Sequence, residues 1–450
     1  MPAKSSSPAL FQWLMAALLI ALTIGLGYFT RQHEFTKITG FYTPLFLLYL
    51  LAIHPSPLIP HPSLKFYLSL AILLRLILLF SMPNLSNDVY RFIWDGRLLV
   101  QGYNPFDHLP LFYLENAVKV EGIDQALFEA FGAKNTYTSY PPVAQVQFAS
   151  ACWLFPENIY GCVVVMKLWL FVFEAGSIFL IIKLLRRFNL PERNVLLYAL
   201  NPLIILEIMG NLHFEGAMIF FLLLALWLLT ARCWSLSAIA FALSICSKLL
   251  TLMFLPFFVK KMGWGRSLRY FFITGAVTVL LFLPVVNPSF FGNFSESLGL
   301  YFQKLEYNAS LYYLLRWVGW QIAGYNMIAR FGPALGLLAM TGIFWLAFKG
   351  SSRSNPNLKD LPEAWLFAIC IYLACTTTVH PWYLALPVVL CVFTKWRFPV
   401  VWSGLIFLTY INYSYEPFWE NLWVVALEYA FTAAWAIWEW RSSKEKALSL

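Results

Sequence analysis

The sequence predicts an all-α polytopic membrane protein of about 11–14 transmembrane helices, with short amphipathic helices in its outer loops and no large soluble domain. Hydrophobic residues make up 60% of the chain and charged residues 12%, and the mean hydropathy is +0.68. Soluble globular proteins carry about twice that share of charged residues. Long apolar runs recur along the whole chain, and clusters of Lys and Arg lie between them.

The apolar runs are the candidate spans, although several are shorter than the roughly 20 residues that cross a bilayer upright. They are Phe11 to Phe29, Phe41 to Ile53, Phe66 to Phe80, Tyr160 to Ile182, Asn194 to Met209, Ala217 to Leu229, Ser235 to Ser247, Leu249 to Val259, Tyr270 to Val286, Phe331 to Phe348, Ala364 to Thr378, Tyr383 to Thr394, Pro399 to Ile411 and Leu422 to Trp440. The first run is too long for a signal peptide and is expected to be a retained helix.

The basic clusters predict the side of the membrane on which each loop lies. With a cytoplasmic N-terminus, every strong cluster falls inside, as the positive-inside rule requires. The clusters are Lys183, Arg186, Arg187 and Arg193; Lys260, Lys261, Arg266 and Arg269; Lys349 and Arg353; Lys395 and Arg397; and Arg441, Lys444 and Lys446. The same parity places three polar regions outside: Ser81 to Asn158, Asn287 to about Arg316, and Asn412 to Asn421. The net charge of +9 is therefore attributed to the basic loops that orient the chain in the membrane, and no nucleic-acid partner is expected.

This topology requires the chain to break at Lys248. One continuous helix from Ser235 to Val259 would bury that lysine in hydrocarbon, at a cost of at least ~2.5 kcal/mol. Two short helices instead bring Lys248 to the outer face.

The first outer loop opens with a charged amphipathic segment, Ser-Asn-Asp-Val-Tyr-Arg-Phe-Ile-Trp-Asp-Gly-Arg, at positions 86–97. Asp88 and Asp95 are seven residues apart, as are Tyr90 and Arg97, so each pair shares one helical face two turns apart. An interfacial helix with solvated charges is the plain alternative. The turn-forming Gly-Tyr-Asn-Pro that follows, and the length of the loop, favour a functional site.

Later parts of the chain add polar motifs at outer ends. Within the loop, Gly122 to Gly132 predicts a short amphipathic helix, and Tyr-Pro-Pro at 140–142 predicts a stop followed by a new helix. Further motifs are Asn-Leu-His-Phe-Glu-Gly at 211–216 and Val-His-Pro-Trp-Tyr at 379–383. Between them, the segment from Asn308 to Arg316 predicts the start of a helix that carries an arginine two turns in. A hydrogen-bonded interface histidine would explain His213, and an aromatic belt would explain the last motif except for His380.

The segment at 86–97, with the Tyr-Asn-Pro-Phe that follows, resembles the first outer loop of bacterial polyprenyl-phosphate-mannose-dependent mannosyltransferases. These are members of the GT-C class of integral-membrane glycosyltransferases. Tyr140 to Gln145 resembles the Tyr-Pro-Pro-x-x-Gln segment that closes this loop in the family, and Val-His-Pro-Trp-Tyr is also typical. Two positions depart from the pattern of the family. Glu215 stands where an Asn-Asp pair usually follows the histidine, and Asn87 stands where an acidic pair often begins. The resemblance implies one GT-C-like domain over residues 1–450, with residues 81–158 as its extracytoplasmic catalytic loop.

The resemblance implies an inverting transfer of a sugar, mannose in the family, from a polyprenyl-phosphate donor to an acceptor hydroxyl. The reaction is expected on the extracytoplasmic side of a bacterial inner membrane that the chain crosses many times. The expected partners are the lipid-linked donor, a glycan, lipid or protein acceptor, and membrane lipids. No cofactor is required and no metal ligand is assigned. A divalent metal is left open, although a single Asp offers few hard oxygen ligands for it.

Each polar residue then receives an expected role. Asp88 is the candidate general base, and Lys248 and Arg316 are the candidates for the donor phosphate. Asp95 lies roughly 10 Å from Asp88 along a helix, too far to pair with it, and is expected to hold Arg91 or Arg97. The full set expected to bind substrate is Asp95, Arg91, Arg97, Tyr140, His213, Glu215, Lys248, Arg316, His380 and Tyr383.

A polytopic flippase or transporter of lipid-linked sugars, without transferase activity, is the competing class. Broken helices and internal charges are expected there too. However, the sequence has no internal repeat relating its halves, and its polar motifs gather on one face rather than at the midplane.

Overall fold

The computed structural model describes residues 8–54, 63–116, 118–132, 134–349 and 357–448. These residues form an all-helical protein without β-strands, in which 76% of the chain is helix and several helices are long and apolar. The predicted class, an all-α polytopic membrane protein without a large soluble domain, is confirmed. Arg353 lies outside the described residues, as do the side chains of Lys444 and Lys446.

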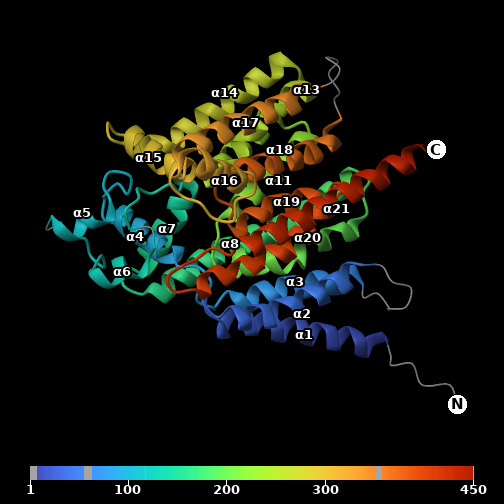
Figure 1. Cartoon of the computed structure of the whole chain (residues 1–450), viewed down its shortest axis with the longest axis horizontal. Coiled ribbons are helices and arrows are strands. Elements are labelled where there is room, and N and C mark those ends of the chain that lie inside the picture. Colours follow the sequence, from blue (N-terminus) through green and yellow to red (C-terminus); the bar gives the residue numbers. More distant parts are fainter. Residues whose placement is uncertain (1–7, 55–62, 117, 133, 350–356, 449–450) are drawn as a thin grey trace.

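The helices are arranged with most of their long axes roughly parallel (Figure 1). Those that precede the first polar loop are α1 (Pro8–Phe29), α2 (Phe35–Ile53) and α3 (Leu64–Leu78). The loop carries α4 (Asp88–Val100), α5 (Pro110–Glu115), α6 (Gln125–Ala130) and α7 (Pro142–Leu154). The middle of the chain forms α8 (Ile159–Arg187), α9 (Leu196–Ala199), α10 (Pro202–Ile204), α11 (Glu215–Thr230), α12 (Trp234–Ser247), α13 (Phe257–Met262) and α14 (Trp264–Phe282). The last part forms α15 (Phe290–Gln303), α16 (Leu311–Ala323), α17 (Ile328–Phe348), α18 (Leu361–Cys375), α19 (Ala385–Cys391), α20 (Phe398–Leu405) and α21 (Leu422–Leu448).

Five helices in the described part are long and apolar enough to cross a membrane, and a bent pair makes up to six. The bent pair, Glu192–Ala199 and Pro202–Gly210, turns by 51° and replaces the predicted continuous run from Asn194 to Met209. It bends because the Asn201 side chain accepts the N–H of Leu203 and caps a new helix that Pro202 begins. Other apolar helices in the described part are shorter, among them Glu215–Thr230, Trp234–Ser247 and Pro381–Cys391.

The predicted break at Lys248 is confirmed. Helix α12 ends at Ser247, and Lys248 has extended backbone angles, φ −160° and ψ 131°. A 3₁₀ turn at Leu249–Phe254 and the short helix α13 follow. The lysine therefore sits in a gap between helices, where its side chain is free to reach other segments.

The molecule has two distinct ends. Helices α4 to α6 lie at one end, and the start of α1 and the end of α21 lie at the other (Figure 1). Lys260 donates to the carbonyl of Lys349, and Lys261 pairs with Asp360 at 3.0 Å, so separate basic clusters meet. The contacts thus bring together the segments around Lys260, Lys349 and Asp360, which the charge pattern assigns to the inner side.

The first polar loop folds around the contact of α4 with α7. Gly96 allows this approach, because a Cβ there would lie 2.6 Å from the carbonyl oxygen of Phe148. Helix α7 begins at Pro142, as the Tyr-Pro-Pro motif predicts. Helix α6 is shorter than the predicted segment from Gly122 to Gly132 and is capped by the Asp124 side chain, which accepts the N–H of Leu127.

A buried ion pair joins α3 to α8 in the core of the bundle. Arg75 Nε donates to Glu174 Oε2 at 2.9 Å, and both side chains are fully buried. Arg75 also donates to the carbonyl of Ala199, and the hydroxyl of Tyr198 donates to Glu174 Oε1 at 2.5 Å. Every charge in this cluster thus has a hydrogen-bonding partner, which is the condition for burying charges at tolerable cost.

Candidate functional site

Asp88 is the first residue of α4, where the helix dipole favours a carboxylate. Its side chain is 34% exposed, and its Oδ2 lies 3.9 Å from His213 Nε2. The hydroxyl of Tyr140 lies 3.5 Å from the same oxygen. Three segments that are far apart in the sequence therefore meet at this carboxylate.

His213 is held on the side away from Asp88. Its Nδ1 lies 2.9 Å from the carbonyl oxygen of Glu207 and 3.2 Å from that residue's carboxylate. Its ring stacks on Trp382 with centroids 3.8 Å apart. Among the described residues, Nε2 has no hydrogen-bond partner. Glu207 thus directs Nε2 toward Asp88 and leaves that nitrogen able to exchange a proton.

Lys248 and Glu215 form an ion pair beside Asp88. Lys248 Nζ donates to Glu215 Oε1 and lies 4.8 Å from the centre of the Tyr383 ring. Glu215 is buried, whereas 25% of the Lys248 side chain is exposed. The accessible partner of this pair is therefore the cation, which suits an anionic ligand.

His380 completes the aromatic side of the cluster. Its ring stacks between Trp382 and Tyr307, with centroid distances of 4.4 Å and 4.9 Å. Burial, together with the neighbouring His213 and Lys248, lowers the pKa of His380 to about 3. His380 is therefore a neutral ring at physiological pH, acting through stacking and its ring nitrogens.

The electrostatic surroundings of Asp88 are mixed. Burial raises the pKa of the Asp88 carboxyl above its ordinary value, whereas His213 and Lys248 lower it. Glu215 raises the pKa of Asp88, and the Tyr140 hydroxyl lowers it slightly. The net direction is upward, toward the range in which a carboxylate is a better proton acceptor.

A family model described as alpha-(1->6)-mannopyranosyltransferase, N-terminal domain, matches residues 37–263. The match covers half of the chain and includes Asp88, Tyr140, His213, Glu215 and Lys248. The chain belongs to this mannosyltransferase family. It is therefore a glycosyltransferase by family, which agrees with the resemblance of its outer-loop motifs. A search of curated proteins gave no match.

Seven of the expected site residues of this mannosyltransferase lie in one cluster, and it is formed by segments from both halves of the chain. Asp88, Tyr140, His213, Glu215 and Lys248 come from the matched part. His380 and Tyr383 come from the turn after α18. His380 contacts the cluster by stacking on Trp382, and Tyr383 contacts it through Lys248.

Three other expected residues have structural partners instead. Asp95 is fully buried and accepts from Arg91 Nε at 2.9 Å, which confirms the predicted pairing. Arg91 also donates to the carbonyl of Thr136, and Arg97 donates to the carbonyls of Pro156 and Gly122. Their burial and bonds tie the outer loop together, and their expected role in substrate binding stays a prediction.

Arg316 lies in a second cluster, on α16. Its Nη1 donates to Glu306 Oε1 at 2.6 Å, and its guanidinium lies 4.4 Å from the Tyr313 ring centre. None of these contacts reaches Asp88 or Lys248. Its role as a phosphate ligand stays a prediction.

Three members of the site were not predicted from the sequence: Glu207, Trp382 and Tyr410. Tyr410 donates to Glu207 Oε1 at 2.8 Å and fixes the carboxylate that holds His213. Glu207 lies inside an apolar run, and an ionisable residue within such a run indicates a functional position. That signal was present in the sequence.

Within the described residues, no group of three or more His, Cys, Asp or Glu side chains is arranged to hold a metal ion. The metal dependence of the reaction stays open.

Proposed function

We propose that the chain transfers mannose from a polyprenyl-phosphate donor to an acceptor hydroxyl, with inversion, on the extracytoplasmic side of a bacterial inner membrane. The family description adds an α-(1→6) linkage as the product. The observation that supports this most is the partly exposed Asp88 carboxylate beside the partly exposed cation of Lys248. A base for the acceptor and a cation for the leaving phosphate are the two groups that such a reaction needs.

In the proposed step, the acceptor oxygen attacks the anomeric carbon while the bond from that carbon to the phosphate oxygen breaks. The bonding electrons leave with the phosphate, whose growing charge Lys248 stabilises. The hydroxyl proton passes to Asp88. A β-linked donor then yields an α-linked product.

His213 is proposed to relay the proton from Asp88 to water after the sugar has been transferred. Its unpaired Nε2 faces Asp88, and Glu207 holds the ring from the other side. The proton taken by Asp88 passes to Nε2 and from there to water, which restores the base for the next turnover.

The test of this proposal compares donors with the purified full chain in an uncharged detergent. We expect transfer from polyprenyl-phosphate-mannose and none from a nucleotide sugar alone, because the sequence has no Gly-rich nucleotide loop. Robust transfer from a nucleotide sugar in a lipid-carrier-free preparation would contradict the proposal. Movement of the lipid-linked sugar across vesicles, without formation of a glycoside, would favour the flippase alternative.

The pH dependence of kcat/KM should report the surroundings of Asp88 in the free enzyme. Activity is expected to fall as the pH drops through a pKa that lies above the ordinary value for Asp. Lys248→Ala removes a cation that lowers this pKa, so the acid limb should move to higher pH. Glu215→Gln removes a carboxylate that raises it, so the limb should move to lower pH. Shifts of both variants in the same direction would exclude Asp88 as the titrating group.

A further inference from the structure

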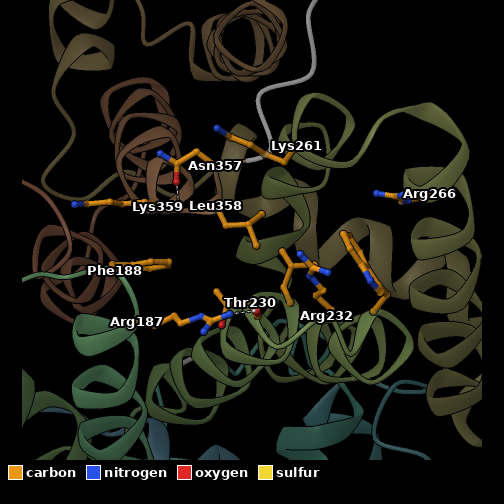
Figure 2. A pocket seen from close by; sticks show the side chains of 11 residues that line it. Arg187, Phe188, Thr230, Arg232, Lys261, Arg266, Asn357, Leu358 and Lys359 are labelled. Carbon is orange, nitrogen blue, oxygen red and sulfur yellow. Dashed lines mark hydrogen bonds between the residues drawn. The ribbon is translucent and has the colours of Figure 1, made fainter.

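A pocket whose lining includes none of the residues around Asp88 lies among loops that the charge pattern assigns to the inner side. Its volume is about 640 Å³, and Figure 2 shows the side chains around it. The lining comes from the end of α8, the turn between α11 and α12, the α13–α14 corner and the segment before α18. The lining residues are Arg187, Phe188, Leu229, Thr230, Arg232, Trp234, Lys261, Arg266, Asn357, Leu358 and Lys359.

Five of the lining side chains are cations and none is a carboxylate. Lys261 pairs with Asp360, and Arg187 donates to the carbonyl of Thr230. Arg266 lies 5.6 Å from the Trp234 ring centre, a contact that leaves its N–H groups free. Among the described residues, neither Arg232 nor Arg266 has a hydrogen bond or ion pair through its guanidinium. The pocket thus has an excess of positive charge that the protein does not balance.

Two helices add to this positive field. Trp234 begins α12, and Arg266 lies in the first turn of α14. The first N–H groups of a helix lack partners within it, and its N-terminus carries a partial positive charge. Neither first turn contains an acidic residue. Arg266, as a cation in such a turn, is unfavourable by itself. Its position becomes favourable once an anion binds between its guanidinium and the helix N-terminus.

The backbone of Arg232 is the least expected feature of the pocket. Its φ is +63°, a left-handed angle, at the turn that ends α11. Cys233 N donates to the carbonyl of Leu228, and Arg232 N to that of Leu229, which is the helix-ending geometry that usually carries glycine at this position. An arginine is therefore placed where glycine would fit with less strain, and its side chain lines the pocket.

We propose that this pocket binds a phosphate group, carried either by an anionic lipid headgroup or by a free phosphate compound. Several arginines that converge on one cavity match the bidentate geometry of phosphate oxygens. The positive-inside rule explains an excess of Lys and Arg in these loops. It does not explain why cations from four segments line one cavity, or why one of them occupies a glycine-type position.

The test uses the purified full chain in an uncharged detergent and two probes. Inorganic pyrophosphate is titrated by equilibrium dialysis, and retention of phosphatidylglycerol against phosphatidylcholine is counted by native mass spectrometry. Saturable binding of pyrophosphate indicates a free phosphate compound. Selective retention of phosphatidylglycerol without pyrophosphate binding indicates a lipid headgroup.

Arg232→Gly is the informative variant, because it removes the charge and relieves the backbone strain. We expect about tenfold weaker binding of the effective probe, with a melting temperature that is unchanged or higher. Arg266→Gln should weaken binding similarly. Arg186→Gln is the matched control, since Arg186 is an exposed cation nearby that pairs with Glu192 outside the pocket.

Three results would overturn the proposal. They are the absence of saturable binding or selective retention with both probes, wild-type binding by both pocket variants, and an equal loss of binding in the Arg186→Gln control.

Discussion

Asp88→Asn should lower turnover by roughly 10²–10⁴-fold, the usual share of a general base, while donor binding survives. The amide keeps the size of the side chain and can still contact Tyr140 and His213. It cannot accept the proton of the acceptor hydroxyl at the needed strength. Single-turnover rates with the lipid-linked donor, and donor affinity measured separately, distinguish loss of the base from loss of the site.

Asp124→Asn is the matched control for this substitution. Asp124 lies in the same outer loop and caps α6, and Asn caps a helix about as well as Asp. Its turnover should stay near that of the wild type. Near wild-type turnover in a folded Asp88→Asn enzyme would end the case for Asp88, and Glu215 would be the next carboxylate to test.

Arg75→Met should destabilise the protein by about 3–5 kcal/mol, the cost of breaking a buried ion pair by removing one partner. The substitution leaves the carboxylate of Glu174 buried without its ion-pair partner, and it also removes the donors to the carbonyls of Ala71 and Ala199. This loss is a large part of the 5–15 kcal/mol that typically separates folded from unfolded protein. The yield of folded protein and its melting temperature in detergent should both fall.

Arg186→Met provides the comparison for that prediction. It also removes one arginine from an ion pair, but the pair with Glu192 is exposed, and exposed pairs contribute about 0–1 kcal/mol. A melting temperature of Arg75→Met within a degree or two of the Arg186→Met value would show that burial does not make the Arg75–Glu174 pair important.

Much of the fold was predictable because membrane insertion depends on local composition. Runs of apolar residues and the basic clusters between them identify an all-α polytopic protein. The break at Lys248 was predictable for the same reason, since one charge inside an apolar run is costly. The bend at Asn201 was not predicted, although the Asn-Pro pair that causes it is visible in the sequence.

The candidate site was predictable only as a set of residue types. The outer-loop motifs indicated Asp88, Tyr140, His213 and Lys248 by their chemistry and resemblance. They could not predict that Arg97 donates to the backbone carbonyls of Gly122 and Pro156, because no side-chain pattern records the position of a carbonyl group.

The sequence by itself determined the helical membrane class, the family and the placement of charge between apolar runs, because each of these depends on neighbouring residues. Only the tertiary structure decided which charges are neutralised inside the protein and which are left to meet a ligand. It buries Arg75 and Asp95 with partners and leaves Asp88 and Lys248 partly open. That division depends on packing between segments that are distant in the sequence, such as those of Arg75 and Glu174 or of Asp88 and His213, which no local pattern specifies.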